Sequence, residues 1–159
     1  MTPKQFFTRL QADLKDLVWD DVPNSKMFGD SVFVVAKIPI EQISTFRPPV
    51  CFIVDNGGRL DSDHPGLIDQ NFSLTIFVEN LQDHMTQGIL MGANRTAGTS
   101  LGAGLLDIEE ELLPYLIDKT VLTTKIMLIE KGVPKANVAK SNNPSMFRAL
   151  TLSVLLSLY

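Results

Sequence analysis

Cysteine, histidine and long apolar runs are scarce in this sequence, and each shortage narrows what the protein can do. The 159 residues include one cysteine and two histidines. A disulfide framework is therefore excluded, and a buried thiol at Cys51, within the apolar run VCFIV, suits a reducing compartment. No apolar stretch approaches the ~20 residues that span a bilayer. The N-terminal MTPKQFFTRLQADLKD lacks an uninterrupted apolar core, so we expect no signal peptide.

Charge is also modest. Charged residues make up 20% of the chain and the formal net charge is −4. Non-specific binding to duplex DNA needs a basic face that releases counterions, so this composition argues against it. Hydrophobic residues make up 45%, enough for a core in one domain of ordinary size. We therefore expect a single domain over residues 1–159, with long loops at 55–68, 84–100 and 132–145.

Two segments have the three-to-four-residue apolar spacing of amphipathic helices. The first follows a Thr2–Pro3 start signal and should end near Trp19, before Pro23. The second should be kinked or ended by Pro114. In the second segment we expect Leu101, Leu105, Ile108 and Leu112 to be buried and Asp107, Glu109, Glu110 and Glu111 to face solvent.

Strand-like patterns separate the two helices and follow the second. They cover residues 31–39, 50–54, 71–81, 124–131 and 147–159. Residues 55–68 are polar, and we expect a hairpin there with an extended tip. The segment 71–81 alternates well, with Phe77 as the exception on its outer face, and 147–159 has one wholly apolar face. The order predicts an α+β fold: a mixed, mostly antiparallel sheet of about four to five strands, with two main helices on one face.

A glycine-rich segment, residues 88–117, runs into the second predicted helix. A phosphate-binding P-loop needs a lysine after its second glycine, and this segment has none. A dinucleotide fingerprint needs three glycines, but after Gly102 and Gly104 the third position is Asp107, which would repel a pyrophosphate. Nucleotide binding is therefore rejected. We expect residues 94–100 to be poorly ordered until a subunit or tube partner binds.

Two carboxylates and an imidazole lie close together in the polar stretch, at Asp61, Asp63 and His64. Such a set could bind a divalent cation in a metal-dependent enzyme. However, the calcium-loop pattern fails, because Pro65 occupies its third ligand position. We favour a solvated loop tip. The other histidine, His84, has no nucleophile beside it in sequence, so nothing indicates covalent catalysis.

Basic residues gather in the C-terminal third of the chain. Lys131, Lys135 and Lys140 belong to a segment without acidic residues, and Lys119, Lys125 and Arg148 add to the excess. This segment is either a solvated loop or one that faces passing DNA or an acidic neighbouring surface. In a ring-forming protein, the acidic face of the second helix could meet this basic loop of the next subunit.

Several short sequence segments follow one another in an order that is informative about the family. After the first helix comes VFVVAKIPIEQISTFRPPVCFI, then HPGLIDQNF before SLTIFVEN, then GILMGANR and a glycine-rich run into GLLDIEEELL, and finally two strands. Over almost its full length the chain resembles the small tail terminator (tail completion or neck) proteins of long-tailed bacteriophages. Neighbouring head–tail joining proteins have a similar layout.

The resemblance implies a virion structural protein without enzymatic activity, cofactor or metal, assembled in the host cytoplasm. Such proteins form a ring, commonly hexameric, on the head-proximal end of the tail tube. The ring stops tube polymerisation and faces the head–tail connector, and genomic DNA passes through its lumen. The alternative is another connector or stopper protein of the neck. As contacts with other copies or with the tube we expect Asn94, Arg95, Thr96, Thr99, Ser100, Glu109 and Glu110, with Phe77 as a further interfacial residue.

Overall fold

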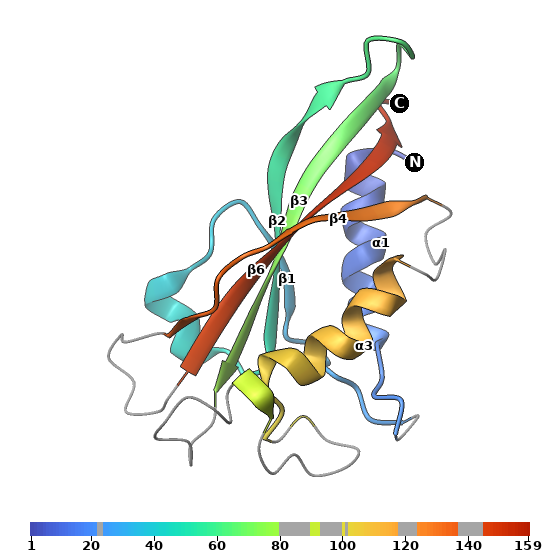
Figure 1. Cartoon of the computed structure of the whole chain (residues 1–159). Coiled ribbons are helices and arrows are strands. Elements are labelled where there is room, and N and C mark those ends of the chain that lie inside the picture. Colours follow the sequence, from blue (N-terminus) through green and yellow to red (C-terminus); the bar gives the residue numbers. More distant parts are fainter. Residues whose placement is uncertain (22–23, 80–89, 93–99, 101, 118–123, 137–144) are drawn as a thin grey trace.

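The computed structural model describes the whole chain except residues 22–23, 80–89, 93–99, 101, 118–123 and 137–144 (Figure 1). The elements form one α+β unit of helices and a six-stranded sheet. In chain order they are α1 (Pro3–Asp16), β1 (Val32–Val35), the 3-10 helix η1 (Ile40–Thr45), β2 (Val50–Leu60), β3 (Leu67–Glu79), α3 (Leu105–Ile117), β4 (Ile126–Lys131), β5 (Lys135–Ala136) and β6 (Ser145–Ser157).

The sheet is mixed and mostly antiparallel, as the sequence predicted. Its order is β1-β2-β3-β6-β4, with β5 also paired to β6. The β1–β2 pair is parallel and every other pair is antiparallel. The strand number is six rather than four to five, because β5 forms inside the predicted loop 132–145 and pairs with Met146 and Phe147.

Both helices pack on one face of the sheet (Figure 1). The Thr2 side chain caps α1 in a capping box with Gln5, which fixes where the helix begins. Apolar side chains at helical spacing turn inward from both helices onto the alternating apolar face of β6, which the sequence predicted. The fully buried residues include Phe6, Leu10, Leu14, Leu105, Ile108, Leu112, Leu150, Leu152 and Val154. Leu101 lies outside the described residues.

The first helix ends earlier than predicted, and the second is not ended by its proline. α1 ends at Asp16, and the next residues instead form a turn in which the Trp19 backbone N–H donates to the Ser25 carbonyl oxygen at 2.9 Å. α3 continues past the exposed Pro114 to Ile117. Neither described helix is long and apolar enough to cross a membrane.

A second apolar cluster lies on the opposite face of the sheet. Phe52 and Phe77 are buried there under η1, and the Phe46 ring lies 5.5 Å from that of Phe52, edge to face. The exposed fraction of Phe77 is 2%. Phe77 does lie on the outer face of its strand, as predicted, but the expectation that it is exposed as an interfacial residue is wrong, because η1 and its flanking residues cover this part of the sheet.

The polar stretch 55–68 is mostly strand rather than loop. β2 continues to Leu60 and β3 begins at Leu67, so only residues 61–66 form the connection. Beyond Val54, β2 has no pairing with β1, and the hairpin projects past both helices (Figure 1). We call residues 55–69 the arm. Most of its residues are exposed and polar, and its few apolar residues, Leu60, Leu67 and Ile68, do not form the apolar alternation that marks a half-buried strand in a sequence.

Candidate functional site

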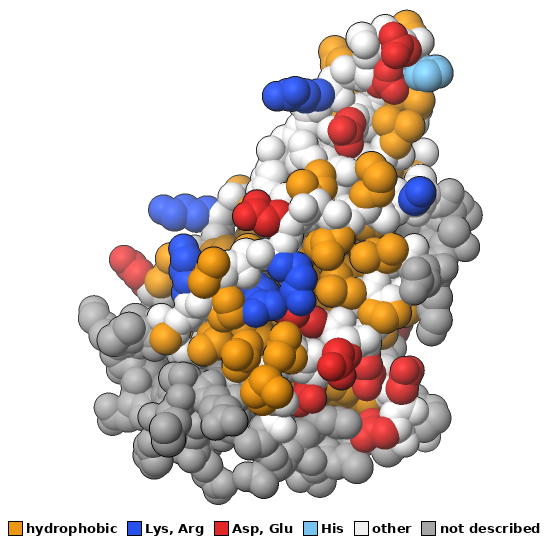
Figure 2. All heavy atoms as spheres, in the orientation of Figure 1, with side chains coloured by type: hydrophobic (Ala, Val, Ile, Leu, Met, Phe, Trp, Pro, Cys, Tyr) orange, Lys and Arg blue, Asp and Glu red, His pale blue; other side chains and the backbone are white. Residues whose placement is uncertain are grey.

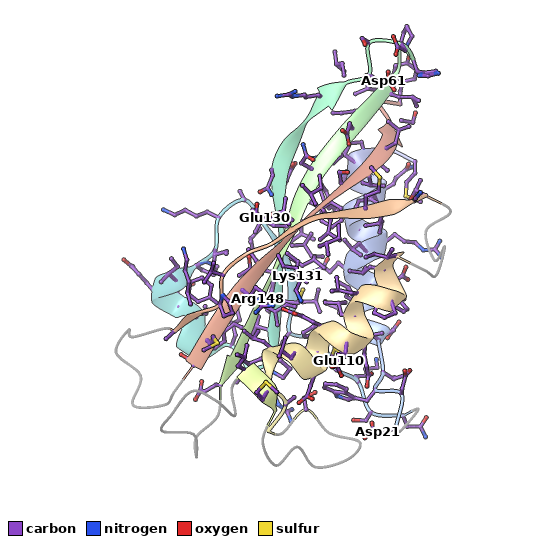
Figure 3. All side chains as sticks on the ribbon, in the orientation of Figure 1. Asp21, Asp61, Glu110, Glu130, Lys131 and Arg148 are labelled. Atoms are coloured by element: carbon purple, nitrogen blue, oxygen red, sulfur yellow. The ribbon has the colours of Figure 1, made fainter. Side chains whose placement is uncertain are left out.

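Three charged side chains from α3, β4 and β6 meet under the sheet. The Oε2 atom of Glu109 accepts from Lys131 Nζ at 2.8 Å and from Arg148 Nη1 at 2.9 Å. Figure 3 shows Lys131 and Arg148 close together between β6 and α3. Strand register explains the meeting, since Lys131 lies opposite Leu150 and Arg148 points to the same face as Leu150.

This cluster corrects the prediction for Glu109, which was expected to face solvent and contact another subunit, yet is only 2% exposed. Lys131 is the last residue of β4, as it is of the strand predicted over 124–131, and its ammonium group pairs within the subunit. The predicted attraction between the acidic helix and the basic segment thus occurs within one subunit. The helical spacing already indicated that Glu109 would be buried, because Glu109 follows Leu105 by four residues and precedes Leu112 by three, and so lies on the same face of the helix.

The cluster carries more positive than negative charge. One carboxylate meets two cations, and among the described residues Glu109 Oε1 and Arg148 Nε are buried without a hydrogen-bond partner. Ion pairs this deep stabilise little by themselves, but removing one partner is costly. The cluster therefore acts as a cross-link that fixes where α3 lies under β4 and β6. Lys131 is the more accessible cation, with 40% of its side chain exposed.

The glycines of the glycine-rich segment allow its backbone to pack closely against the start of α3. The Oδ2 atom of Asp107 accepts from the Gly104 backbone N–H at 3.1 Å, which caps the helix. A Cβ on Gly104 would lie 2.7 Å from the Leu90 carbonyl oxygen and would overlap the Gly92 backbone. Asp107, which stands where a dinucleotide fingerprint would have its third glycine, thus caps the helix instead of leaving room for a phosphate.

Ser100 is held within the subunit. Its Oγ accepts from Trp19 Nε1 at 3.0 Å and donates to the Met27 carbonyl oxygen at 2.6 Å. These bonds tie Ser100 to the turn after α1. Ser100 is the only described residue of the segment 94–100, which was expected to be poorly ordered, so the expectation for the rest of that segment lies outside the described residues. The other proposed contacts in this segment, Asn94, Arg95, Thr96 and Thr99, lie outside the described residues.

The candidate metal ligands form the tip of the arm. Asp61 Oδ1 accepts from the backbone N–H groups of Asp63 at 2.9 Å and His64 at 3.2 Å, and its Oδ2 lies 3.3 Å from His64 Nδ1. The carboxylate therefore organises the turn that reverses the chain. In the part of the chain that the structure describes, no group of three or more potential ligand side chains is placed to hold a metal ion.

Asp61 gives a pH-dependent prediction. The bond from the Asp63 backbone N–H, followed by the bonds from His64, holds the pKa of Asp61 below its ordinary value. A lowered folded-state pKa contributes stability that is present above the ordinary pKa of about 4 and is lost as pH falls through the lowered value. We expect thermal unfolding of Asp61→Asn to lose this acid dependence. Wild type and variant should differ most near neutral pH and converge below the folded-state pKa. A gap that stays constant down to the lowest pH would contradict the assignment.

The outer edge of the sheet, residues 126–136, exposes apolar side chains. We call it the β4–β5 edge. Met127 is 50% exposed, Ile129 59% and Val133 77%. Ile129 lies at a bulge between Leu128 and Glu130, which turns it out of the regular pairing. In Figure 2 this face shows basic side chains set among apolar ones, with acidic side chains toward the lower right.

The remaining predicted contacts lie on or near this face. Lys135 is exposed in β5 and Glu110 is exposed on α3, so both are free to meet another surface. Lys140 lies outside the described residues. Sequence reasoning missed the apolar edge, although the run IMLI before the charged pair Glu130–Lys131 was a usable signal for it.

Comparisons with known proteins add no relative: no protein-family model matches the chain, and no curated protein matches it either.

Proposed function

We propose that this protein is a virion structural subunit, a tail terminator of a long-tailed bacteriophage. Copies of the chain form a ring, hexameric by the resemblance, on the head-proximal end of the tail tube. The ring stops tube polymerisation and joins the tail to the head–tail connector. The order of elements and the short sequence phrases support this proposal, as does the α+β fold, which agrees with the expected layout.

The observation that carries the proposal is the β4–β5 edge. Large apolar side chains at a sheet edge mark a surface that binds another protein chain. Here Ile129 and Val133 are more than half exposed, at 59% and 77%. A catalytic role has no comparable support, because the one candidate metal set is engaged in its own turn. We therefore propose a role in assembly rather than in catalysis.

The proposed partners are other copies of the chain, the tail tube protein and the connector. Genomic DNA passes through the ring without sequence-specific binding, and the protein resides in the neck of the virion. The mild net charge of −4 is consistent with DNA that slides past rather than binds.

Light scattering and negative-stain electron microscopy of the purified protein, alone and with purified tail tubes, test the proposal. We expect rings with a central hole, or a monomer that assembles only on tube ends, and tubes of fixed length in its presence. A protein that stays monomeric and does not bind tubes contradicts the proposal. Rings that bind the connector but not the tube assign the protein to another head–tail joining role in the neck.

A further inference from the structure

The end of the arm exposes a second set of apolar side chains. Leu60 is 69% exposed, Leu158 39% and Tyr159 89%. Leu60 lies opposite Ile68, which lies opposite Leu156, so the three form a row across β2, β3 and β6. Leu156 faces the helices and is 2% exposed, but the arm projects past both helices, so the outer end of the row has no helix over it (Figure 1).

The arm and the β4–β5 edge carry opposite charge. Residues 55–69 contain four aspartates and one arginine, a net charge of −3 with His64 neutral. The β4–β5 edge, residues 126–136, contains two lysines and one glutamate, a net charge of +1, and Lys125 directly precedes it. Lys131 is paired with Glu109, so the basic excess at this surface comes from Lys125 and Lys135 against Glu130. Opposite charge around two apolar patches favours their contact and fixes its orientation.

One subunit cannot bring its own two patches together. Leu60 on β2 and Ile129 on β4 belong to strands that are three positions apart in the sheet order β2-β3-β6-β4, which places them about 14 Å apart across the sheet. Along β6, Leu60 is level with Leu156, whereas Ile129 lies between the partners of Leu152 and Thr151. The sheet holds this separation, so any contact between the patches must join two molecules.

The opposite edge of the sheet is a weaker candidate for such a contact. β1 has only four residues, Val32–Val35. The Gln11 side chain of α1 donates to the Val32 carbonyl oxygen at 2.8 Å and so occupies a group that an added strand would need. This contact protects part of the β1 edge. β1 has one exposed large apolar side chain, Val34 at 41%, whereas the β4–β5 edge exposes Met127, Ile129 and Val133 at 50%, 59% and 77%.

We propose that the arm of one copy of this chain docks on the β4–β5 edge of the next copy. The contact joins two different surfaces, so an open chain of bound copies always keeps one free arm at one end and one free edge at the other. Repetition of such a contact closes into a ring when the rotation between copies permits. The inference rests on the proposed function only in that it supplies the subunit contact of the ring.

Paired variants test the contact. Leu60→Asp places a charge at the end of the arm and Ile129→Asp places one on the edge. We expect each variant to be monomeric under conditions in which wild type assembles. In an equal mixture, the intact edge of Leu60→Asp subunits can bind the intact arm of Ile129→Asp subunits. The mixture should therefore form dimers and nothing larger, measured by light scattering or mass photometry.

A matched control separates the contact from general surface effects. Ile40 on η1 is 58% exposed, nearly the same as Ile129 at 59%, but lies outside both patches. Ile40→Asp should assemble like wild type. Circular dichroism melts should show all three variants folded. Assembly that survives Ile129→Asp overturns the inference. Loss of assembly in Ile129→Asp with normal assembly in Leu60→Asp also overturns it, in favour of pairing between two like edges.

Cysteine cross-linking separates this inference from the proposed function. Burial raises the pKa of the single native thiol, Cys51, to about 12, so it will not compete. Leu60→Cys protein mixed with Val133→Cys protein at high concentration should form a disulfide-linked heterodimer. Cross-linking without rings in wild type would leave the arm contact standing and reject the ring. Rings in wild type without cross-linking would reject the arm contact and leave the ring standing. Absence of both would reject both.

Discussion

Replacement of Arg148 by methionine should lower the free energy of unfolding by about 3 kcal/mol, because it removes the better-buried of the two cations that hold Glu109. The Arg148 side chain is 10% exposed and that of Glu109 2%, so water cannot replace the lost guanidinium. Lys131 remains beside the carboxylate and keeps the cost from being larger. Urea unfolding followed by circular dichroism measures the effect.

Two controls accompany this prediction. Lys131→Met removes a half-exposed cation and should cost only about 1 kcal/mol. The double variant Arg148→Met with Glu109→Leu removes the buried carboxylate together with its partner and should regain most of the lost stability. If the double variant is less stable than Arg148→Met alone, Glu109 has a role beyond pairing with the two cations.

Replacement of Gly104 by alanine should cost about 2–3 kcal/mol, because the added methyl group has nowhere to go. It would meet the Gly92 backbone and the Leu90 carbonyl oxygen, and backbone atoms cannot move aside as the end of a flexible side chain can. The collision should also displace the Gly104 N–H from Asp107 and loosen the first turn of α3. Thermal and urea unfolding measure the loss.

Gly29 provides the matched control. Its φ is +56°, which is unfavourable for other residues, but an added Cβ there would have no atom within 4 Å. Gly29→Ala should therefore cost only the backbone strain, about 1 kcal/mol. Equal losses at the two positions would show that crowding at Gly104 is relieved by a small shift of the chain.

The parts of the fold that follow a regular apolar period could be predicted from the sequence. The helical spacing of apolar residues from Phe6 to Leu14 predicted α1, and the same spacing from Leu105 to Leu112 predicted α3. The alternation from Leu150 to Val154 gave the face of β6 that lies under the helices. In each case neighbours in the sequence share one buried face, so spacing alone carries the information.

The parts that were missed depend on residues distant in the chain. Glu109 has its partners 22 and 39 residues away, at Lys131 and Arg148, and its burial is explained only once they meet. Phe77 is buried because η1 crosses the outer face of the sheet. Of the arm residues only Ile68 packs against the core, so the arm strands have no regular apolar alternation that could reveal them. The burial of Arg148 could have been predicted, because it lies two residues before Leu150 and four before Leu152, and therefore on the same face of β6.

The position of β6 has a consequence for biosynthesis. This strand is the last of the described elements, yet it lies inside the sheet, where it pairs with β3 over 13 positions from Leu67–Ser157 to Glu79–Ser145. While the ribosome is still making the intervening residues, β3 has an open inner edge and the apolar faces of α1 and α3 have no β6 beneath them. Closure over such long sequence separations is slow and leaves edges exposed. Nascent chains stalled before β6 should therefore recruit chaperones and resist protease poorly, and both properties should change together once β6 has left the exit tunnel.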